Sequence, residues 1–307
     1  MASEWYLKVS GAWKQVNEAF YKQSGSWKEI QEAWIKVGGS WKQFYTAFVA
    51  TAFSTATSNT SITVPTGANA IHVQAAVGGG SGGVVGAEYD KAGGESAGAG
   101  GASGGYVSDQ VYSVTEGETL TLTIGAGGTG TTGSPYNSTA GDGGDTILSG
   151  STTGTIFTLT GGEGGSGTGG GVQGPLRSNS PSIAGTGTVS ATPLTSGTFR
   201  EANGATVTFG TATTLNQGPV GTFNQSGNGV AGTNPGNCGG DNCQITGGVG
   251  GASYAGNIAG GAGGVPSSSS GGNGTRGSGA GGGGAQGQTG GGNGGTGEIK
   301  YRFLRIN

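Results

Sequence analysis

The fold of this chain is decided by a glycine-rich stretch, residues 247–297, which reads GGVGGASYAGNIAGGAGGVPSSSSGGNGTRGSGAGGGGAQGQTGGGNGGTG. The unit GGxGG occurs at 247–251, 260–264 and 291–295, and earlier in the chain at 79–83 and 161–165. A three-residue period with two glycines fits an extended helix of the polyproline II type, which has three residues per turn and no internal hydrogen bonds. Two faces of such a helix carry only hydrogen. Neighbouring helices can therefore bond backbone to backbone, helped by weak Cα–H···O contacts, while the third face carries any side chain.

Two other structures compete with packed polyglycine helices. Collagen requires a strict Gly-X-Y register with abundant proline, and eight prolines with a broken register exclude it. A flexible Gly/Ser linker is the second alternative. Residues 298–306 alternate charged and apolar side chains, which is typical of a strand. Because the chain must bring this strand back to a sheet, we favour an ordered segment before it, built from packed polyglycine helices.

The composition of the chain argues against an enzyme. Among 307 residues there are 76 glycines, one histidine, one methionine and two cysteines, so few catalytic groups are present, and we predict neither enzymatic activity nor a cofactor. Residues 51–300 hold twelve acidic and five basic residues, which gives no basic stripe for nucleic acid. The N-terminus has no signal-peptide pattern. The longest apolar run, near residues 47–53, is too short for membrane insertion.

The N-terminal residues repeat with a period of 14. Residues 11–20, 25–34 and 39–48 share the pattern Gly-x-Trp-Lys, and aromatic residues recur every seven positions within it. This spacing fits the heptad of a coiled coil. However, Ser-Gly or Gly-Gly pairs interrupt the repeat regularly, and each interior glycine costs a helix about 1 kcal/mol relative to alanine. A β meander with turns at these pairs is the alternative that we favour, with aromatic side chains packing across strands.

Residues 1–50 are predicted to form an attachment and oligomerisation module. Roughly fifty residues with this much aromatic surface cannot bury it alone, so the repeat is expected to associate with itself or with a larger body. A homo-oligomer in the form of a symmetric trimer suits the repeat. The residues expected to make the contacts are the aromatic series Trp5, Trp13, Phe20, Trp27, Trp34, Trp41 and Phe48.

Residues 51–307 are predicted to form a second, all-β domain. A polar connector, 51–61, leads into a β-sandwich that the C-terminal strand closes, with the glycine-rich segments as large insertions at one end. Residues 171–245 are a further insertion. Strands are expected within 61–77 (two strands around a Pro-Thr-Gly turn) and at 106–114, 119–124, 145–148, 155–160 and 299–306, from alternating apolar residues bounded by turn residues.

The ordered motifs of this domain resemble a known family. Ile62-Thr63-Val64-Pro65-Thr66-Gly67, Ser113-Val114-Thr115-Glu116-Gly117-Glu118-Thr119-Leu120-Thr121-Leu122-Thr123-Ile124-Gly125, Gly141-Asp142-Gly143-Gly144-Asp145-Thr146 and the final Gly297-Glu298-Ile299-Lys300-Tyr301 follow one another. Together they resemble the glycine-rich domain common in bacteriophage tail fibre and tail tip proteins, over about residues 52–307. The Gly-x-Trp-Lys repeat is similar to repeats of phage structural proteins. The long insertion departs from the family pattern.

The resemblance implies a virion protein on the phage particle surface, made in the host cytoplasm, that binds the host cell. In related polyglycine adhesins, variable loops between the glycine helices contact the receptor. The implied partners are other copies of the chain, other tail or fibre proteins, and a bacterial surface saccharide or outer-membrane protein. Exposed aromatic and arginine side chains on a rigid backbone are the usual anchors of such contacts. The candidates that interrupt the glycine tracts are Tyr89, Tyr136, Arg177, Arg200, Tyr254 and Arg276.

Other candidate chemistry in the sequence is weak. His72 has no second histidine to form a catalytic set, and Cys238 and Cys243 cannot complete a four-ligand zinc site. These two cysteines are either joined by a local disulfide or present as thiols. Residues 140–148 nearly match a calcium-binding repeat, but the unit stands alone, so an Asp-Gly turn is favoured and no metal is predicted.

Three functions remain open from the sequence. A non-enzymatic phage fibre subunit or adhesin comes first. A purely structural virion protein, such as a head fibre or decoration subunit, is the alternative. A polysaccharide depolymerase ranks below both because no acid/base pair is marked in the sequence. An ice-binding polyglycine protein is conceivable, but the aromatic repeat gives no reason for it.

Overall fold

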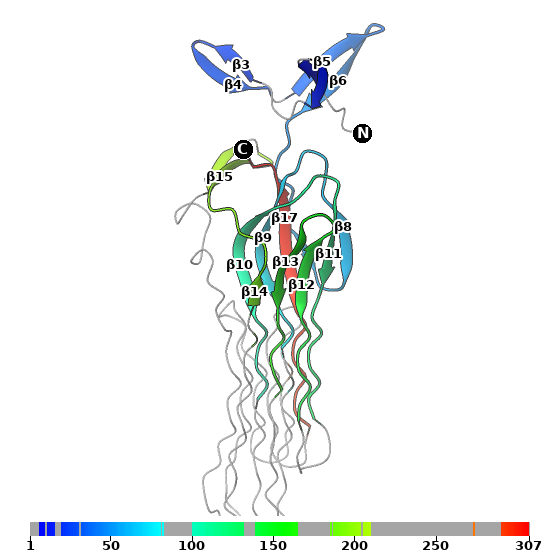
Figure 1. Cartoon of the computed structure of the whole chain (residues 1–307), viewed down its shortest axis with the longest axis vertical. Coiled ribbons are helices and arrows are strands. Elements are labelled where there is room, and N and C mark those ends of the chain that lie inside the picture. Colours follow the sequence, from blue (N-terminus) through cyan, green and yellow to red (C-terminus); the bar gives the residue numbers. More distant parts are fainter. Residues whose placement is uncertain are drawn as a thin grey trace, which may run out of the picture.

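The computed structural model describes residues 6–9, 11–15, 20–30, 32–80, 82, 100–131, 139–164, 185, 187–203, 205–209, 273 and 290–306. Regular structure in these residues is entirely β, with no helix, as the sequence predicts. It follows that these residues contain no helix long and apolar enough to cross a membrane. Figure 1 shows short hairpins at the N-terminal end of the molecule, a sandwich in the middle, and described glycine-rich segments running away from the sandwich on the opposite side.

The 14-residue repeat forms three hairpins, here called ribbons 1 to 3. Ribbon 1 pairs β1 (Tyr6–Val9) with β2 (Ala12–Gln15), ribbon 2 pairs β3 (Phe20–Gln23) with β4 (Ser26–Glu29), and ribbon 3 pairs β5 (Glu32–Val37) with β6 (Ser40–Thr46). Each is a separate two-stranded sheet in the described residues, so the expected meander is a series of independent hairpins.

The turns of the ribbons explain why the repeat forms hairpins and not a coiled coil. Positive φ values occur at Ser24 (50°) and Gly25 (85°), and at Gly38 (58°) and Gly39 (87°). Two consecutive residues with positive φ characterise the type I′ turn, whose twist matches that of a two-residue hairpin. The Ser-Gly and Gly-Gly pairs that interrupt the heptad pattern are therefore the residues that the hairpins require.

The sandwich consists of two antiparallel sheets. The four-stranded sheet has the order β10 (Tyr106–Ser113), β9 (Ala70–Val77), β17 (Glu298–Leu304), β7 (Ser54–Ala56). The five-stranded sheet has the order β14 (Gly187–Val189), β13 (Gly154–Leu159), β12 (Thr146–Gly150), β11 (Thr119–Thr123), β8 (Thr60–Thr63). The sequence predicts most of these strands. It misses β7, which lies in the segment expected to be a connector, and β14, which lies in the predicted insertion.

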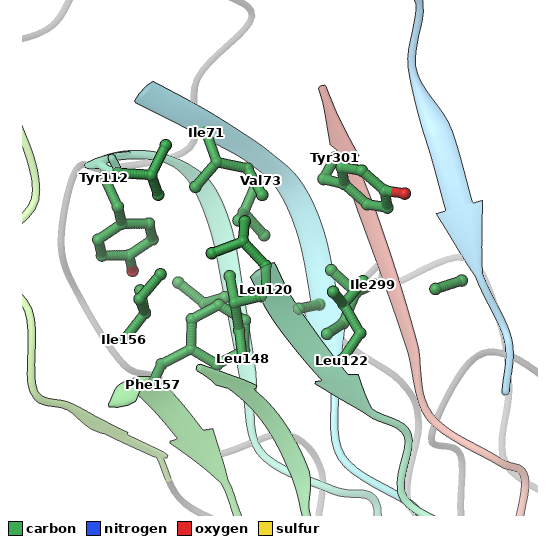
Figure 2. Close-up of a cluster of buried hydrophobic side chains, with 14 of the residues drawn as sticks. Ile71, Val73, Tyr112, Leu120, Leu122, Leu148, Ile156, Phe157, Ile299 and Tyr301 are labelled. Atoms are coloured by element: carbon green, nitrogen blue, oxygen red, sulfur yellow. The ribbon is translucent and has the colours of Figure 1, made fainter. Parts of the chain in front are cut away.

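The core lies between the two sheets (Figure 2). Ile71 and Val73 of β9, with Ile299 of β17, face Leu120, Leu122, Leu148, Ile156 and Phe157 of the second sheet, and all eight side chains are buried. Alternation of apolar residues places those of β9 and β11 on the inner face. The consecutive Ile156 and Phe157 are both buried where the register between β12 and β13 shifts. Tyr112 is fully buried in the same cluster, and burial raises the pKa of its hydroxyl.

A small hairpin from the predicted insertion packs outside this core. It consists of β15 (Gly197–Arg200) and β16 (Thr206–Phe209), paired antiparallel. Phe199 and Phe209 join Ala70, Val111 and Leu304 in a second buried cluster. Ala70 and Leu304 are adjacent in sequence to inward-facing residues, so this cluster covers the outer face of the four-stranded sheet. The insertion therefore contributes to the packed body.

The end of the sandwich nearest the ribbons is held by a buried carboxylate. Glu118 is 5% exposed and accepts hydrogen bonds from the N–H groups of Thr115 (2.6 Å), Thr152 (3.1 Å) and Thr153 (3.0 Å), and from the Thr153 hydroxyl (2.6 Å). Burial raises the pKa of this carboxyl, but the hydrogen bond from the Thr153 hydroxyl and those from the backbone outweigh it, so the pKa is lowered from its ordinary value of 4.5. Glu118 thus joins two turns that are distant in sequence.

We predict that Glu118→Gln lowers the free energy of unfolding by about 1–3 kcal/mol at neutral pH, because the amide NH₂ cannot accept the bonds that the carboxylate accepts. A carboxyl with a lowered pKa stabilises the fold above its unfolded-state pKa, and this stabilisation is lost as the pH falls through the folded-state pKa. The variant should therefore lose less stability than the wild type below pH 4.5. Denaturant unfolding at several pH values measures both effects. Glu116→Gln is the control, since Glu116 is half-buried and accepts one hydrogen bond, from the Gly67 N–H, in the described contacts. An equal loss of stability in both variants would contradict the role assigned to Glu118.

Candidate functional site

The described glycine-rich segments leave the sandwich at one end. The strand register shows this, because Val77 pairs with both Tyr106 and Glu298, and Thr123 pairs with Ile147. Strand ends that face one another in this way share one edge of the sandwich. The segments beyond them are called segment 1 (78–80 and 82), segment 2 (100–105), segment 3 (125–131), segment 4 (139–144), segment 5 (160–164) and segment 6 (290–297).

Segment 1 bonds to its neighbours as a three-fold helix would. The N–H group of Gly78 donates to segment 2 (2.8 Å), that of Gly79 to segment 4 (2.9 Å) and that of Gly80 to segment 6 (2.8 Å). Three consecutive N–H groups thus reach three different segments. A strand directs its N–H groups to only two sides, whereas a helix with three residues per turn directs them to three. This confirms polyglycine II packing for segment 1.

Segment 1 is also the centre of the bundle. Its carbonyl groups accept hydrogen bonds from segment 5, through Gly162, and from segment 3, through Gly128. Segment 1 is therefore bonded to all five others, and these are bonded to one another in the order 2, 5, 4, 3, 6. Three donor directions and three acceptor directions per turn allow six neighbours in a hexagonal array. The described residues supply five of them.

The close approach of these backbones requires glycine. A Cβ at Gly128 would overlap the carbonyl oxygen of Gly141, and a Cβ at Gly143 would overlap that of Gly79. Similar overlaps with a neighbouring segment's backbone occur at Gly79, Gly82, Gly125, Gly127, Gly130, Gly161, Gly162 and Gly164. The obstructing atoms belong to the backbone and cannot move aside as a side chain can. The glycine content is thus a packing requirement.

Side chains appear on the outer segments at every third position. Segment 4 and the residue after it expose Thr139, Asp142 and Asp145, segment 3 exposes Ala126 and Thr129, and segment 6 exposes Asn293. Between them stand the glycines that face neighbouring helices. This period of three is the helical repeat. The outer surface of the bundle can therefore vary in sequence without disturbing the contacts inside it.

Some of these side chains bond the backbone of the next segment. Asp142 accepts from the N–H of Gly164 (2.7 Å), Asp145 accepts from that of Gly161 (3.1 Å), and Asn293 accepts from that of Gly130 (2.8 Å). The two aspartates that suggested a calcium repeat thus bridge segments 4 and 5. No group of three or more His, Cys, Asp or Glu side chains in the described residues is placed to hold a metal.

The ribbons carry apolar side chains exposed to solvent. Trp27, Trp41 and Trp34 are 69%, 65% and 50% exposed, and Ile35 and Val37 are 52% and 49% exposed. Residues two apart or directly paired across a ribbon share a face, and adjacent residues lie on opposite faces. Trp34 and Trp41 therefore share one face of ribbon 3, because Trp41 pairs with Lys36. Ile35 and Val37 lie on the other face, so both faces of this ribbon are apolar.

A buried charged cluster fixes the β15–β16 hairpin to the sheet. Arg302 of β17 donates to both carboxylate oxygens of Glu201, each at 2.9 Å, and its Nε donates to Nδ1 of His72 at 3.2 Å. Its guanidinium lies 4.5 Å from the ring centre of Phe53 and 5.1 Å from that of Phe199, which are cation–π distances. Because Nδ1 accepts a hydrogen bond, the His72 proton is on Nε2, 3.5 Å from the Asp109 carboxylate. Sequence reasoning identified His72 but not its partners.

The residues predicted to contact a receptor fall mainly outside the described residues. This applies to Tyr89, Tyr136, Arg177, Tyr254 and Arg276, and also to Trp5, Cys238 and Cys243. Arg200 is half-buried at the end of β15. Trp13 and Phe20 lie in ribbon strands, and Phe48 packs against the sandwich core. Of the six receptor candidates, Arg200 alone is therefore among the described residues.

The sequence matches the glycine-rich domain family over residues 54–304, which is more than half of the chain. The chain belongs to this family. The glycine-rich domain so defined includes the sandwich and all six segments, whereas the ribbons precede it. A comparison with curated proteins found no match.

Substitution of a packed glycine is predicted to destabilise the glycine-rich domain strongly. Gly128→Ala inserts a methyl group against the Gly141 carbonyl and should lower the free energy of unfolding by about 1–3 kcal/mol or more. Ala126→Thr, two residues away on the exposed face, should change it by less than about 0.5 kcal/mol. Thermal unfolding compares the two variants. Equal midpoints would show that segments 3 and 4 are not packed as described.

Removal of the Arg302 side-chain charge is predicted to loosen the β15–β16 hairpin. Arg302→Met removes the ion-pair partner of Glu201 and should destabilise the protein by about 1–3 kcal/mol. The loss is smaller than for a fully buried pair because the Glu201 side chain is 28% exposed. Amide exchange of Phe199 and Val207 should then quicken more than that of Leu120 and Leu148 in the central core. Uniform quickening across these four amides would contradict a local role.

Proposed function

We propose that this protein is a non-enzymatic subunit of a bacteriophage fibre or tail tip, that its glycine-rich domain binds a receptor on the host cell surface, and that its ribbons attach or assemble it on the virion. The observation that carries the proposal is the backbone-bonded bundle around segment 1. Such a bundle holds its shape through backbone hydrogen bonds that do not depend on the identity of exposed side chains. A binding surface can therefore change while the fold stays constant.

The connectivity of the bundle supports the same proposal. Segments 1 and 2 are joined by residues 83–99, segments 3 and 4 by 132–138, and segment 5 leads into 165–184. These joining stretches include Tyr89, Tyr136 and Arg177. Aromatic and arginine side chains dominate the energy of many protein interfaces. A rigid support lowers the entropy cost of binding through them.

The proposed receptor is a bacterial surface saccharide or outer-membrane protein. The glycine-rich domain and its connector carry 12 Asp and Glu and 7 Lys and Arg over residues 51–307, so a net charge of 7 − 12 = −5 makes nucleic acid an unsuitable partner. The ribbons contain six lysines and several exposed tryptophans on a surface distinct from the bundle. We assign attachment to the ribbons and receptor contact to the glycine-rich domain.

Binding of the labelled full chain to a panel of bacterial strains tests this function. Saturable binding that also blocks phage infection of the same strain is expected. A shortened chain, residues 47–307, should bind the same strains, since it keeps Ala47, Phe48 and Ala50, which are packed on the body. Binding to no strain by either chain would overturn the receptor proposal and favour a purely structural virion protein. Release of reducing sugar from surface polysaccharide would instead indicate a depolymerase.

Point variants should localise the contact. Tyr136→Ala is expected to weaken cell binding by at least about tenfold if Tyr136 is an anchor, because such a loss corresponds to about 1.4 kcal/mol. Val49→Ala is the control, since Val49 is 38% exposed and lies between the last ribbon strand and the glycine-rich domain. If Val49→Ala weakens cell binding as much as Tyr136→Ala does, the assignment of receptor contact to Tyr136 is wrong.

A further inference from the structure

The three ribbons present one surface three times. In the strand register Lys8 pairs with Trp13, Lys22 with Trp27 and Lys36 with Trp41, so equivalent positions recur every 14 residues. Each ribbon is a two-stranded sheet, and such a sheet is marginally stable alone in water. We call the face with the Lys–Trp pair the tryptophan face and the opposite face the aliphatic face. Trp34 shares the tryptophan face, and Tyr21, Ile35 and Val37 lie on the aliphatic face.

The exposed apolar area of the ribbons reaches the upper end of what monomeric proteins expose. The exposed fractions of Trp27, Trp34 and Trp41 correspond to about 400 Å², given about 150–250 Å² for a whole aromatic side chain. Tyr21, Ile35 and Val37, each about half exposed, raise the total to about 600 Å². That matches the largest patches on typical monomers and approaches the roughly 800 Å² per partner of a standard interface. An area of this size favours a partner that covers the ribbons.

The exposure of both faces decides what kind of assembly can cover them. A two-fold pair would cover one face of each ribbon and leave the other in water. In a closed ring, each copy instead contacts two neighbours through different surfaces, and such a contact is heterologous. We propose that the ribbons bind further copies of this chain in a closed ring, three copies being the smallest, with the tryptophan face of one copy against the aliphatic face of the next. The ring identifies the partner of the ribbons as another copy of the chain, and it rests on the assembly role that the proposed function gives to the ribbons.

The differences between the repeats favour an in-register ring. Ribbon 3 has Ile35 and Val37 where ribbon 2 has Tyr21 and Gln23. A shift by one repeat would place the more polar ribbon 2 against ribbon 3 and leave a terminal ribbon of each copy uncovered. Parallel alignment in register covers all three ribbons and directs every glycine-rich domain to the same end. This is the orientation that a fibre tip needs.

The mass of the full chain in solution tests the ring. Sedimentation equilibrium at micromolar concentration should give a trimer or a larger closed ring for the wild type. Trp27→Ser/Trp41→Ser, which removes the two most exposed side chains of the tryptophan face, and Ile35→Ser/Val37→Ser, which removes the aliphatic side chains of ribbon 3, should each weaken association by at least about 30-fold. Val49→Ser is the control, because Val49 is 38% exposed but lies after the last ribbon strand. A monomeric wild type, or equal loss in the control, overturns the inference.

A mixture of the two double variants tests the heterologous contact. Each variant alone should be monomeric, whereas an equimolar mixture should form a one-to-one dimer that cannot close, because one intact face of each kind remains. If the Ile35→Ser/Val37→Ser chain forms dimers alone, tryptophan faces bind one another and the ring is wrong. Formation of the one-to-one dimer in the mixture also shows that the ribbons of both variants are folded, and an unchanged thermal midpoint shows the same for the glycine-rich domain. These readouts need no receptor, so a monomer that still binds cells would reject the ring and leave the receptor proposal standing.

Discussion

Hydrogen bonds between the backbones of neighbouring glycine segments are the constraint on which the rest of this structure depends. An extended three-fold helix satisfies none of its own N–H and C=O groups, so each must find a partner on another helix. Segment 1 does so with five neighbours, and a methyl group at Gly128 or Gly143 would occupy the space of a partner's carbonyl oxygen. The positions of the glycines are therefore determined by the need to bring neighbouring backbones into contact. Because each segment begins at a strand end, the sandwich must fix those ends side by side, and its core serves that purpose.

The same constraint separates the interior of the bundle from its surface. Positions that face a neighbouring helix admit only glycine or a few small residues, whereas every third position on an outer segment faces solvent. A globular core couples a surface change to packing through the side chains beneath it. Here an exposed threonine or aspartate stands on a backbone that is bonded independently of it. Asp142 and Asn293 show that outer side chains can still add bonds to adjacent segments. A binding surface built on this support can vary at little cost in stability, which is the physical basis for the proposed receptor role.

The sequence was informative where structure is local. The period of three in the glycine tracts predicts three-fold helices, and the Ser24-Gly25 pair predicts a turn that needs positive φ. Alternating apolar residues predict most sandwich strands. Contacts between distant residues could not be predicted in this way. Arg302 and Glu201 are 101 residues apart in the sequence. The charge pattern of the sequence does not indicate that they form an ion pair beside the β15–β16 hairpin. The short β7 and β14 have too few residues to show a period. The receptor candidates were chosen by residue type alone, and all but Arg200 lie outside the described residues.

The chain thus contains two kinds of repeat that differ in the groups they bring into contact: the glycine repeat pairs backbone groups, and the aromatic repeat leaves apolar side chains exposed. The glycine repeat bonds its backbone groups within the bundle and needs no apolar side chains, and all four described N–H groups of segment 1 donate to neighbouring segments. The aromatic repeat pairs its backbone only within each two-stranded ribbon and leaves tryptophan in water on one face and aliphatic side chains on the other. A single copy of the chain offers nothing in its described residues to cover these faces. The proposed ring would cover these faces by contacts outside the chain, while the glycine bundle would remain available for a different partner at the far end. The ribbons therefore expose apolar side chains at one end, and the glycine bundle is held by its own backbone hydrogen bonds at the other. A protein that attaches at one end and binds at the other needs this arrangement.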